Sequence, residues 1–418
     1  MQVNEALSPY IERVEREIQG RLQEVDRVID HNQWKVIRAF QKHQVSDYHF
    51  ASSTGYGYND RGREVLDSVY ADVFGAEAGL VRPHFASGTH TISTALFGVL
   101  RPGDQLLYIS GTPYDTLHKV IGSHGDGTGS LRDWGIRYDE VDLREDGSPD
   151  WEEIRRKLTP ETKVVGIQRS RGYDWRPSFT IAQIREMTDF VKQLRPDVIV
   201  FVDNCYGEFT ETLEPTEAGA DLMAGSLIKN PGGGIAPTGG YIVGKRQYVE
   251  QAAYRLTAPG IGGEVGAMLD TTRSIYQGLF LAPHFVGQAV KGSIFAACLY
   301  EQLGFETSPR WNEARTDLIQ AIRFTGPDHL VAFVQGIQQA AAVDAYVVPE
   351  PSEMPGYEHA VIMAAGTFIQ GGSLELSADA PIREPYIAYM QGGLTYSHAK
   401  LGAVKALEHL WQRGLLAL

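Results

Sequence analysis

Ile199-Val-Phe-Val-Asp-Asn-Cys-Tyr206 places an acid directly after a short apolar run, and this stretch decides the fold. The run predicts a buried strand over Val198–Val202, so Asp203 would lie at the carboxyl edge of a sheet. Strands are also predicted at 105–110, 163–168 and 222–226, with a hairpin-like strand at 239–243 and helices at 90–100 and 181–194. Such alternation is typical of an α/β fold, with a parallel or mostly parallel sheet and helices on both faces. Open sheets of this kind bind ligands at the carboxyl ends of their strands.

The length of 418 residues exceeds what one hydrophobic core usually supports. We predict a helical arm over 1–50, a large domain over 51–290 and a smaller α+β domain over 291–418. A helix at 286–303 would lead into the small domain, where strands are predicted at 330–333, 345–348 and 358–363, and a last helix at 397–413. With 43% hydrophobic and 22% charged residues, the composition excludes intrinsic disorder as the main state.

Charge and cysteine content exclude several classes of partner. The net charge of −14 would repel nucleic acid and anionic lipid. No apolar run approaches the roughly 20 residues of a membrane-spanning helix, and the N-terminus lacks the pattern of a signal peptide. The two cysteines, Cys205 and Cys298, cannot form a disulfide framework, which fits a reducing cytoplasm. The 12 histidines show no HExxH or similar spacing, so we expect no metal site.

The pattern of apolar residues in the first 45 residues predicts a helical arm. Ser8 and Pro9 form a helix start, and apolar residues recur from Ile11 to Val28 at spacings of three and four. A second helix is expected at 33–42. The apolar face of the arm must be buried on the body of the protein or on a sister subunit. The turn-forming stretch that follows, 51–60, predicts an exposed loop before a helix at 61–74.

Three groups of residues at the predicted strand ends carry the chemistry. Asp203 follows one strand, and Lys229 follows the next strand, 26 residues later and three after Ser226. Ser87, Gly88 and Thr89 lie at the start of a predicted helix, whose free amides and positive dipole end suit an anion. A reactive amine, an acid and a phosphate cup are what pyridoxal phosphate requires of a protein.

In this interpretation Lys229 forms the Schiff base with the cofactor, and Asp203 keeps the ring nitrogen protonated. Tyr114, which follows the strand at 105–110, would stack on the ring. Plainer interpretations stay open for most of these residues. A lysine is usually a solvated surface charge, Ser87 and Thr89 would serve as simple helix caps, and Tyr114 would serve as a core or interface aromatic.

Two further motifs receive no chemical role. Arg169 and Arg171 have the character of a structural ion-pair cluster. The glycine-rich stretch 125–129 does not follow a convincing strand, so we interpret it as a loop rather than a dinucleotide site.

The chain resembles the fold-type I pyridoxal-phosphate enzymes of cysteine and methionine metabolism. Within them it is most similar to the branch labelled methionine gamma-lyase-like or aluminium-resistance proteins, and the likeness covers nearly the whole chain. The motifs that carry it are Gly55-Tyr-Gly-Tyr58, Ala86-Ser-Gly-Thr-His90, Gln168-Arg-Ser-Arg-Gly-Tyr173, Val202-Asp-Asn-Cys-Tyr-Gly-Glu208, Ala224-Gly-Ser-Leu-Ile-Lys-Asn-Pro-Gly-Gly-Gly234 and Leu374-Glu-Leu-Ser-Ala-Asp379. The better-known lyases have a serine three residues before the lysine, matched here by Ser226, which the resemblance implies binds the cofactor. They also have a hydroxyl residue directly before the lysine, where this chain has Ile228.

The resemblance implies further site residues. The family closes its site with a tyrosine and an arginine from a neighbouring subunit, matched by Tyr58 and Arg61, with Tyr56 and Arg63 as alternatives. An arginine of the C-terminal domain holds the substrate carboxylate in the family. Arg383 is the candidate for that role, because a planar guanidinium binds carboxylate through two hydrogen bonds. Tyr56 would contact the substrate, and Tyr58 the cofactor.

The resemblance also implies a carbon–sulfur lyase that acts on a cysteine-, cystathionine- or methionine-like amino acid. In that reaction Lys229, displaced from the cofactor by the substrate amine, removes the alpha proton. A pyridoxal-phosphate aminotransferase needs much the same residues and stays open, as does a cofactor-binding protein with a regulatory or metal-stress role and no turnover. We expect a homodimer with shared sites, or a homotetramer.

Overall fold

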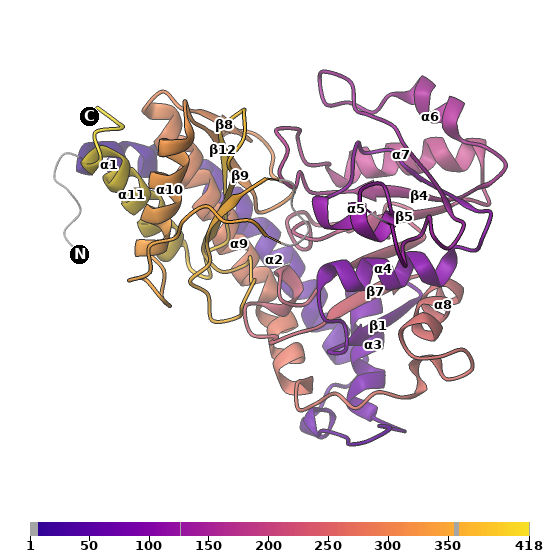
Figure 1. The fold of residues 1–418 in the computed structure, drawn as a ribbon. Coiled ribbons are helices and arrows are strands. Elements are labelled where there is room, and N and C mark those ends of the chain that lie inside the picture. Colours follow the sequence, from indigo (N-terminus) through magenta and orange to yellow (C-terminus); the bar gives the residue numbers. More distant parts are fainter. Residues whose placement is uncertain (1–6, 126, 355–358, 418) are drawn as a thin grey trace.

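Two sheets organise the chain, which the computed structural model describes over residues 7–125, 127–354 and 359–417 (Figure 1). The larger sheet has seven strands in the order β1-β7-β6-β5-β4-β2-β3. Its strands are β1 (Ala78–Arg82), β2 (Gln105–Tyr108), β3 (Arg137–Glu140), β4 (Thr162–Gln168), β5 (Ile199–Asp203), β6 (Leu222–Ser226) and β7 (Gly240–Gly244). All neighbours from β6 to β3 are parallel, and β7 is antiparallel to both β1 and β6. The predicted mostly parallel sheet is therefore confirmed.

Helices cover both faces of the large sheet, as predicted for this fold class. The helices of the chain are α1 (Ser8–Glu17), α2 (Gln19–Lys42), α3 (Arg61–Val73), α4 (Gly88–Val99), α5 (Asp115–Ile121), α6 (Trp151–Lys157), α7 (Ile181–Leu194), α8 (Arg246–Leu256), α9 (Thr272–Gln302), α10 (Pro327–Gln339) and α11 (Tyr396–Gln412), with 3-10 turns at 47–50, 230–232 and 262–264. Alternate residues of β5 point to opposite faces, so Phe201 packs with α4 and α8 while Val200 and Val202 pack with α7.

The second sheet has five antiparallel strands in the order β10-β11-β12-β9-β8. They are β8 (Glu306–Ser308), β9 (Gln320–Arg323), β10 (Val361–Ala364), β11 (Ser377–Pro381) and β12 (Ile387–Gln391). Helices α10 and α11 pack against each other over this sheet, and the long helix α9 connects it to the large sheet (Figure 1).

Two predicted strands of the C-terminal part are wrong. Residues 330–333 lie in α10, which starts after Gly326 with Pro327 in its first turn. Residues 345–348 form an exposed loop, in which Tyr346 is 85% exposed. The strand predicted at 358–363 overlaps β10, although its first residue, Glu358, lies outside the described residues. The last helix is found at 396–412, close to its predicted range.

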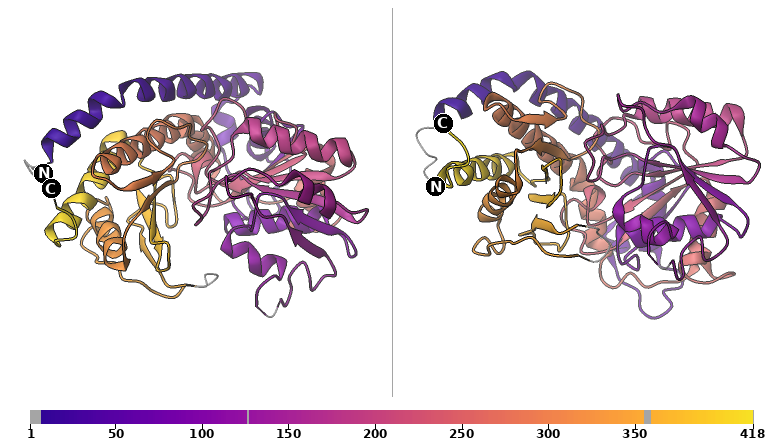
Figure 2. Two further views of the ribbon diagram at one scale, coloured as in Figure 1. Left: turned by 90° about the horizontal axis from the view of Figure 1, so that it is seen from above. Right: turned by 45° about the horizontal axis from the view of Figure 1, so that its top comes forward.

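The arm, α1 and α2, packs on its own chain. Figure 2 shows it running along both lobes of the molecule, and α2 lies against α9. A Cβ added to Gly287 would come within 2.2 Å of the Cδ1 of Ile29, so the two helices approach closely. The Asn32 amide donates to the carbonyls of Phe209 and Glu211 at 3.2 and 2.9 Å. Of the two burial sites that the sequence left open, the body of the protein is therefore the one observed.

Candidate active site

Three strand ends meet at the carboxyl edge of the large sheet. Gln168, the last residue of β4, pairs with Asp203, the last residue of β5, and Asp203 pairs in turn with Ala224 of β6. The loops after these strands therefore leave the sheet side by side. This is the place where open α/β sheets bind their ligands.

Lys229 lies in the loop after β6, held against the loop after β5. The amide of the next residue, Asn230, donates to the carbonyls of Tyr206 and Glu208 at 3.0 and 2.9 Å. The Nζ of Lys229 lies 3.6 Å from the ring centroid of Tyr206. Tyr206 itself has a φ of +73°, a left-handed conformation that bulky residues rarely adopt. Strained backbone of this kind gathers at functional sites, and here it places the tyrosine ring next to the amine.

Charge and burial oppose each other at Lys229. Burial lowers the pKa of its amine, while the side chains of Tyr206, Cys205 and Asp203 raise it, and the net direction is upward. Asp203 is 6% exposed and accepts a hydrogen bond from the backbone N–H of Cys205 at 3.1 Å. Burial raises the pKa of its carboxyl group, against the effect of Lys229. The buried carboxyl group of Asp203 and the amine of Lys229 are thus close enough to shift each other's pKa.

The start of α4, where the sequence predicts a phosphate cup, lies close to the ends of β5 and β6. Ser87 caps the helix, its side chain accepting from the N–H of His90 at 3.0 Å. A Cβ added to Gly88 would lie 3.4 Å from the Cβ of Ser226 and 3.6 Å from the Sγ of Cys205, so the cup faces the ends of β5 and β6. The Ser226 hydroxyl is buried and has no hydrogen-bond partner in the described part of the chain. An unpartnered hydroxyl beside a helix N-terminus suits a bound phosphate.

A cavity of about 310 Å³ lies between the two sheets at this point. Its walls include Thr89, Tyr114, Tyr206 and Lys229 from the large-sheet side, and Asp379 and Gln391 from the small sheet. The Asp379 carboxylate accepts from the Gln391 amide at 3.0 Å, and burial raises its pKa to about 6. Sequence reasoning gave no role to Tyr206, Asp379 or Gln391. The only available signal was that two of them fall within motifs that carry the resemblance.

Tyr114 lies where the sequence placed it, at the start of α5 after β2. Its N–H donates to the side-chain carbonyl of Gln168 at 2.6 Å. A Cβ added to Gly172 would lie 3.1 Å from its ring, and the ring centroid of Tyr173 is 5.5 Å away. The loop after β4 therefore packs directly against the residue that we predict to stack on the cofactor.

The predicted arginines occupy different surroundings. Arg169 is fully buried and donates to Asn204, Gly207 and Glu211, which agrees with a structural role. Arg383 and Arg171 both line an adjoining cavity rather than the cavity around Lys229, and Arg383 donates to the Tyr173 carbonyl at 3.2 Å.

The loop at 51–60 is exposed at its tyrosines, as predicted. Tyr56 is 74% exposed and Tyr58 62%, and their rings lie 5.6 Å apart. Of the two matched arginines, Arg63 is buried and donates to the carbonyls of Gly57, Gly266 and Glu264 in its own chain. Arg61 is exposed and pairs loosely with Glu64.

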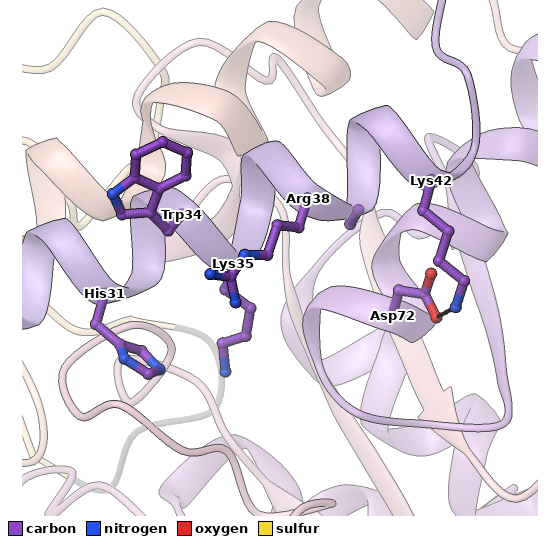
Figure 3. A pocket seen from close by; sticks show the side chains of 7 residues that line it. His31, Trp34, Lys35, Arg38, Lys42 and Asp72 are labelled. Carbon is purple, nitrogen blue, oxygen red and sulfur yellow. Dashed lines mark hydrogen bonds and ion pairs between the residues drawn. The ribbon is translucent and has the colours of Figure 1, made fainter.

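Another hollow, on the outer face of the arm, does not belong to this site. Figure 3 shows His31, Trp34, Lys35 and Arg38 on successive turns of α2, with Lys42 paired to Asp72. Lys35 is paired as well, with Glu217 at 3.0 Å. The hollow shares no residue with the cavity around Lys229.

Glu208 should make the stability of the protein depend on pH. Burial raises the pKa of its carboxyl group to about 8, and Tyr241 donates to it at 2.7 Å. The folded chain then holds a proton that the unfolded chain, with a pKa near about 4.3, releases. The free energy of unfolding therefore falls as pH rises between these values, by up to about 1.4 kcal/mol per pH unit. Glu208→Gln should flatten this slope, measured as melting temperature between pH 5 and pH 8. Parallel slopes for the two proteins would show that Glu208 is not responsible.

No helix in the described ranges is long and apolar enough to cross a bilayer. Within the same ranges, no group of three or more metal-binding side chains lies together.

Comparisons with known proteins find relatives that cover nearly the whole chain. The family model described as methionine gamma-lyase matches residues 7–411. A solved structure from Listeria monocytogenes, a candidate cystathionine beta-lyase involved in aluminium resistance, is 56% identical and superposes with a TM-score of 0.94 over 96% of this chain and 99% of the other. A carbon–sulfur lyase involved in aluminium resistance from Clostridium novyi is 52% identical, with a TM-score of 0.94 over 98% and 96% of the two chains. The L-methionine gamma-lyase of Pseudomonas putida is 29% identical over 49% of this chain and 45% of its own length.

Proposed function

This chain belongs to the methionine gamma-lyase family, and from that premise we propose that it cleaves a carbon–sulfur bond in a cysteine-, cystathionine- or methionine-like amino acid. With one water molecule consumed, the products would be a thiol, ammonia and a 2-oxo acid. Relatives described as a carbon–sulfur lyase and as L-methionine gamma-lyase support the reaction class. One observation carries the proposal: Lys229, Tyr114 and Thr89 line a single cavity, next to the buried Asp203.

The cofactor that the family implies is pyridoxal 5'-phosphate, and the residues present fit it. The N-terminus of α4 and the unpartnered Ser226 hydroxyl would hold its phosphate. Asp203 would keep the ring nitrogen protonated, and Tyr114 would cover the ring. When bound, the cofactor supplies an electron sink for the charge left by the lost alpha proton.

Lys229 would then serve as the general base. Its Nζ removes the alpha proton of the substrate, which requires an amine within reach of the cavity. The Tyr206 ring beside Nζ and the Asn230 hydrogen bonds to the neighbouring loop keep that amine in position. Because two sheets close around the cavity, the reacting atoms would be shielded from bulk water.

We also propose a homodimer or homotetramer in which subunits share sites. The exposed Tyr56 and Tyr58 support this, since exposed aromatic pairs commonly mark an interface. A cytoplasmic location is supported by the two cysteines, which are buried, unpaired thiols.

The purified holoenzyme should release thiol and 2-oxo acid together from at least one sulfur amino acid. Comparing cysteine, cystathionine and methionine as substrates distinguishes beta from gamma elimination. Transfer of the amino group to a second keto acid without thiol release would indicate an aminotransferase instead. Cofactor binding without alpha-proton exchange on any amino acid would indicate a protein without turnover.

A further inference from the structure

Arg171 is a buried arginine, and two of its three guanidinium nitrogens have no hydrogen bond among the described residues. The residue is 1% exposed, and its Nε and Nη1 atoms are buried without a hydrogen bond in the described part of the chain. Burial lowers its pKa, opposed chiefly by Asp317. The Asp317 carboxylate, however, accepts from the backbone N–H groups of Arg171 and Ile319 and from the Ser178 hydroxyl. A buried charge without a partner is costly, so an anion that fits here would be bound firmly.

The place of Arg171 in the fold connects it to the cavity around Lys229. It lies three residues after Gln168, whose Cα is paired with that of Asp203. The next residue, Gly172, packs on the Tyr114 ring.

Arg171 lines an adjoining cavity of about 510 Å³. That cavity shares two wall residues, Tyr114 and Tyr173, with the cavity around Lys229. Tyr173 also contacts Tyr389 of the small sheet, with ring centroids 5.4 Å apart. The charge of Arg171 is therefore placed behind the two tyrosines that border the predicted substrate space.

Neighbouring arginines are already engaged. Arg169 donates to four partners, and Arg176 donates to the carbonyls of Pro177 and Gln168. Arg383 is half-buried, and its guanidinium donates to the Tyr173 carbonyl. The guanidinium of Arg315 is also unpartnered, but it lines a cavity between α2 and α9 that shares no residue with the cavity around Lys229.

We propose that Arg171 binds the carboxylate of the amino-acid substrate. This inference rests on the proposed function and deepens it. The planar guanidinium offers two parallel N–H donors to a carboxylate, and the loop after β4 presents it next to the cofactor-stacking residue. Arg383, to which the resemblance assigns this role, instead positions the segment 171–173 through the Tyr173 carbonyl.

In the test, each single substitution is made in the holoenzyme and kcat/KM is measured with two forms of one substrate, the free amino acid and its methyl ester. Arg171→Ala should reduce kcat/KM for the free amino acid about 10- to 100-fold, as expected for a lost hydrogen bond to a charged group. The methyl ester of the same amino acid lacks the carboxylate charge, so its cleavage should change little. Arg171→Lys keeps the charge but loses the two parallel donors. Its kcat/KM for the free amino acid should lie between those of Arg171→Ala and the unsubstituted protein. Arg155→Ala, on the exposed side of α6, is the matched control for loss of a positive charge and should behave as the unsubstituted protein.

A binding measurement separates this inference from the proposed reaction. Calorimetry with L-alanine, which has no sulfur to cleave, should show binding to the holoenzyme and weaker binding to Arg171→Ala. An unchanged cofactor absorbance spectrum would confirm that the variant is folded and loaded. Equal losses on the acid and the ester would overturn the proposal, as would a carboxylate-specific loss in Arg383→Ala but not in Arg171→Ala. If no sulfur amino acid is cleaved but Arg171-dependent L-alanine binding is present, the proposed reaction fails and the carboxylate site stands.

Discussion

Replacing Lys229 with alanine should lower carbon–sulfur cleavage by a factor of about 1,000 or more, because we propose that this lysine is both the attachment point of the cofactor and the base for the alpha proton. No other lysine lines the cavity that it occupies. Lys229→Arg should be equally inactive, since a guanidinium keeps the positive charge but cannot act as a base near neutral pH. Both variants should keep the fold, because Asn230 still ties the loop to the carbonyls of residues 206 and 208.

Chemical labelling tests the same residue without relying on activity. The purified protein should be yellow, and borohydride reduction should leave the cofactor attached to the peptide that contains Lys229. The Lys229→Ala variant should lose that label, whereas Lys245→Ala, an exposed lysine on the far end of β7, should keep it. Label on another lysine, or a colourless protein that takes up no cofactor, would contradict the assignment.

The acid and the lysine were predictable from sequence because Asp203 lies at the end of one apolar strand and Lys229 lies three residues after the end of the next. A buried strand is visible as a short apolar run, and the residue after it must leave the sheet at the carboxyl edge. The structure brings these residues together through the pairing of β4, β5 and β6. Order along the chain was therefore enough to locate one half of the site.

The other half could not be predicted, because it comes from the small sheet. Asp379 and Gln391 meet Lys229 only through the packing of the two sheets, which no local pattern encodes. The errors in the same region have a similar cause. The apolar run at 330–333 is too short to separate a strand from the buried face of a helix, although Gly326 and Pro327 are helix-start signals that would have favoured α10.

The arm changes how assembly should be tested. From sequence, its apolar face could pack on the body of the protein or on a partner subunit, and the structure buries Val14, Ile18 and Val36 within their own chain. Deleting the arm would therefore expose the core of each subunit and could not separate folding from assembly. The exposed tyrosines of the loop at 51–60 are the better probe, since neither contributes to that core.

Mixing two inactive variants should restore activity if Tyr58 serves the site of a neighbouring subunit. Subunits with Tyr58→Phe keep Lys229, and subunits with Lys229→Ala keep Tyr58. In a mixed dimer one of the two sites then has both residues intact, so random exchange of equal amounts would restore about a quarter of the sites. Native mass spectrometry of the mixture proves the exchange itself, because mixed dimers have a mass between those of the two parent dimers. If each variant is impaired alone and proven subunit exchange restores nothing, Tyr58 does not act across subunits. A Tyr58→Phe variant that is fully active by itself would instead remove Tyr58 from the site and leave Tyr56 to be tested in the same way.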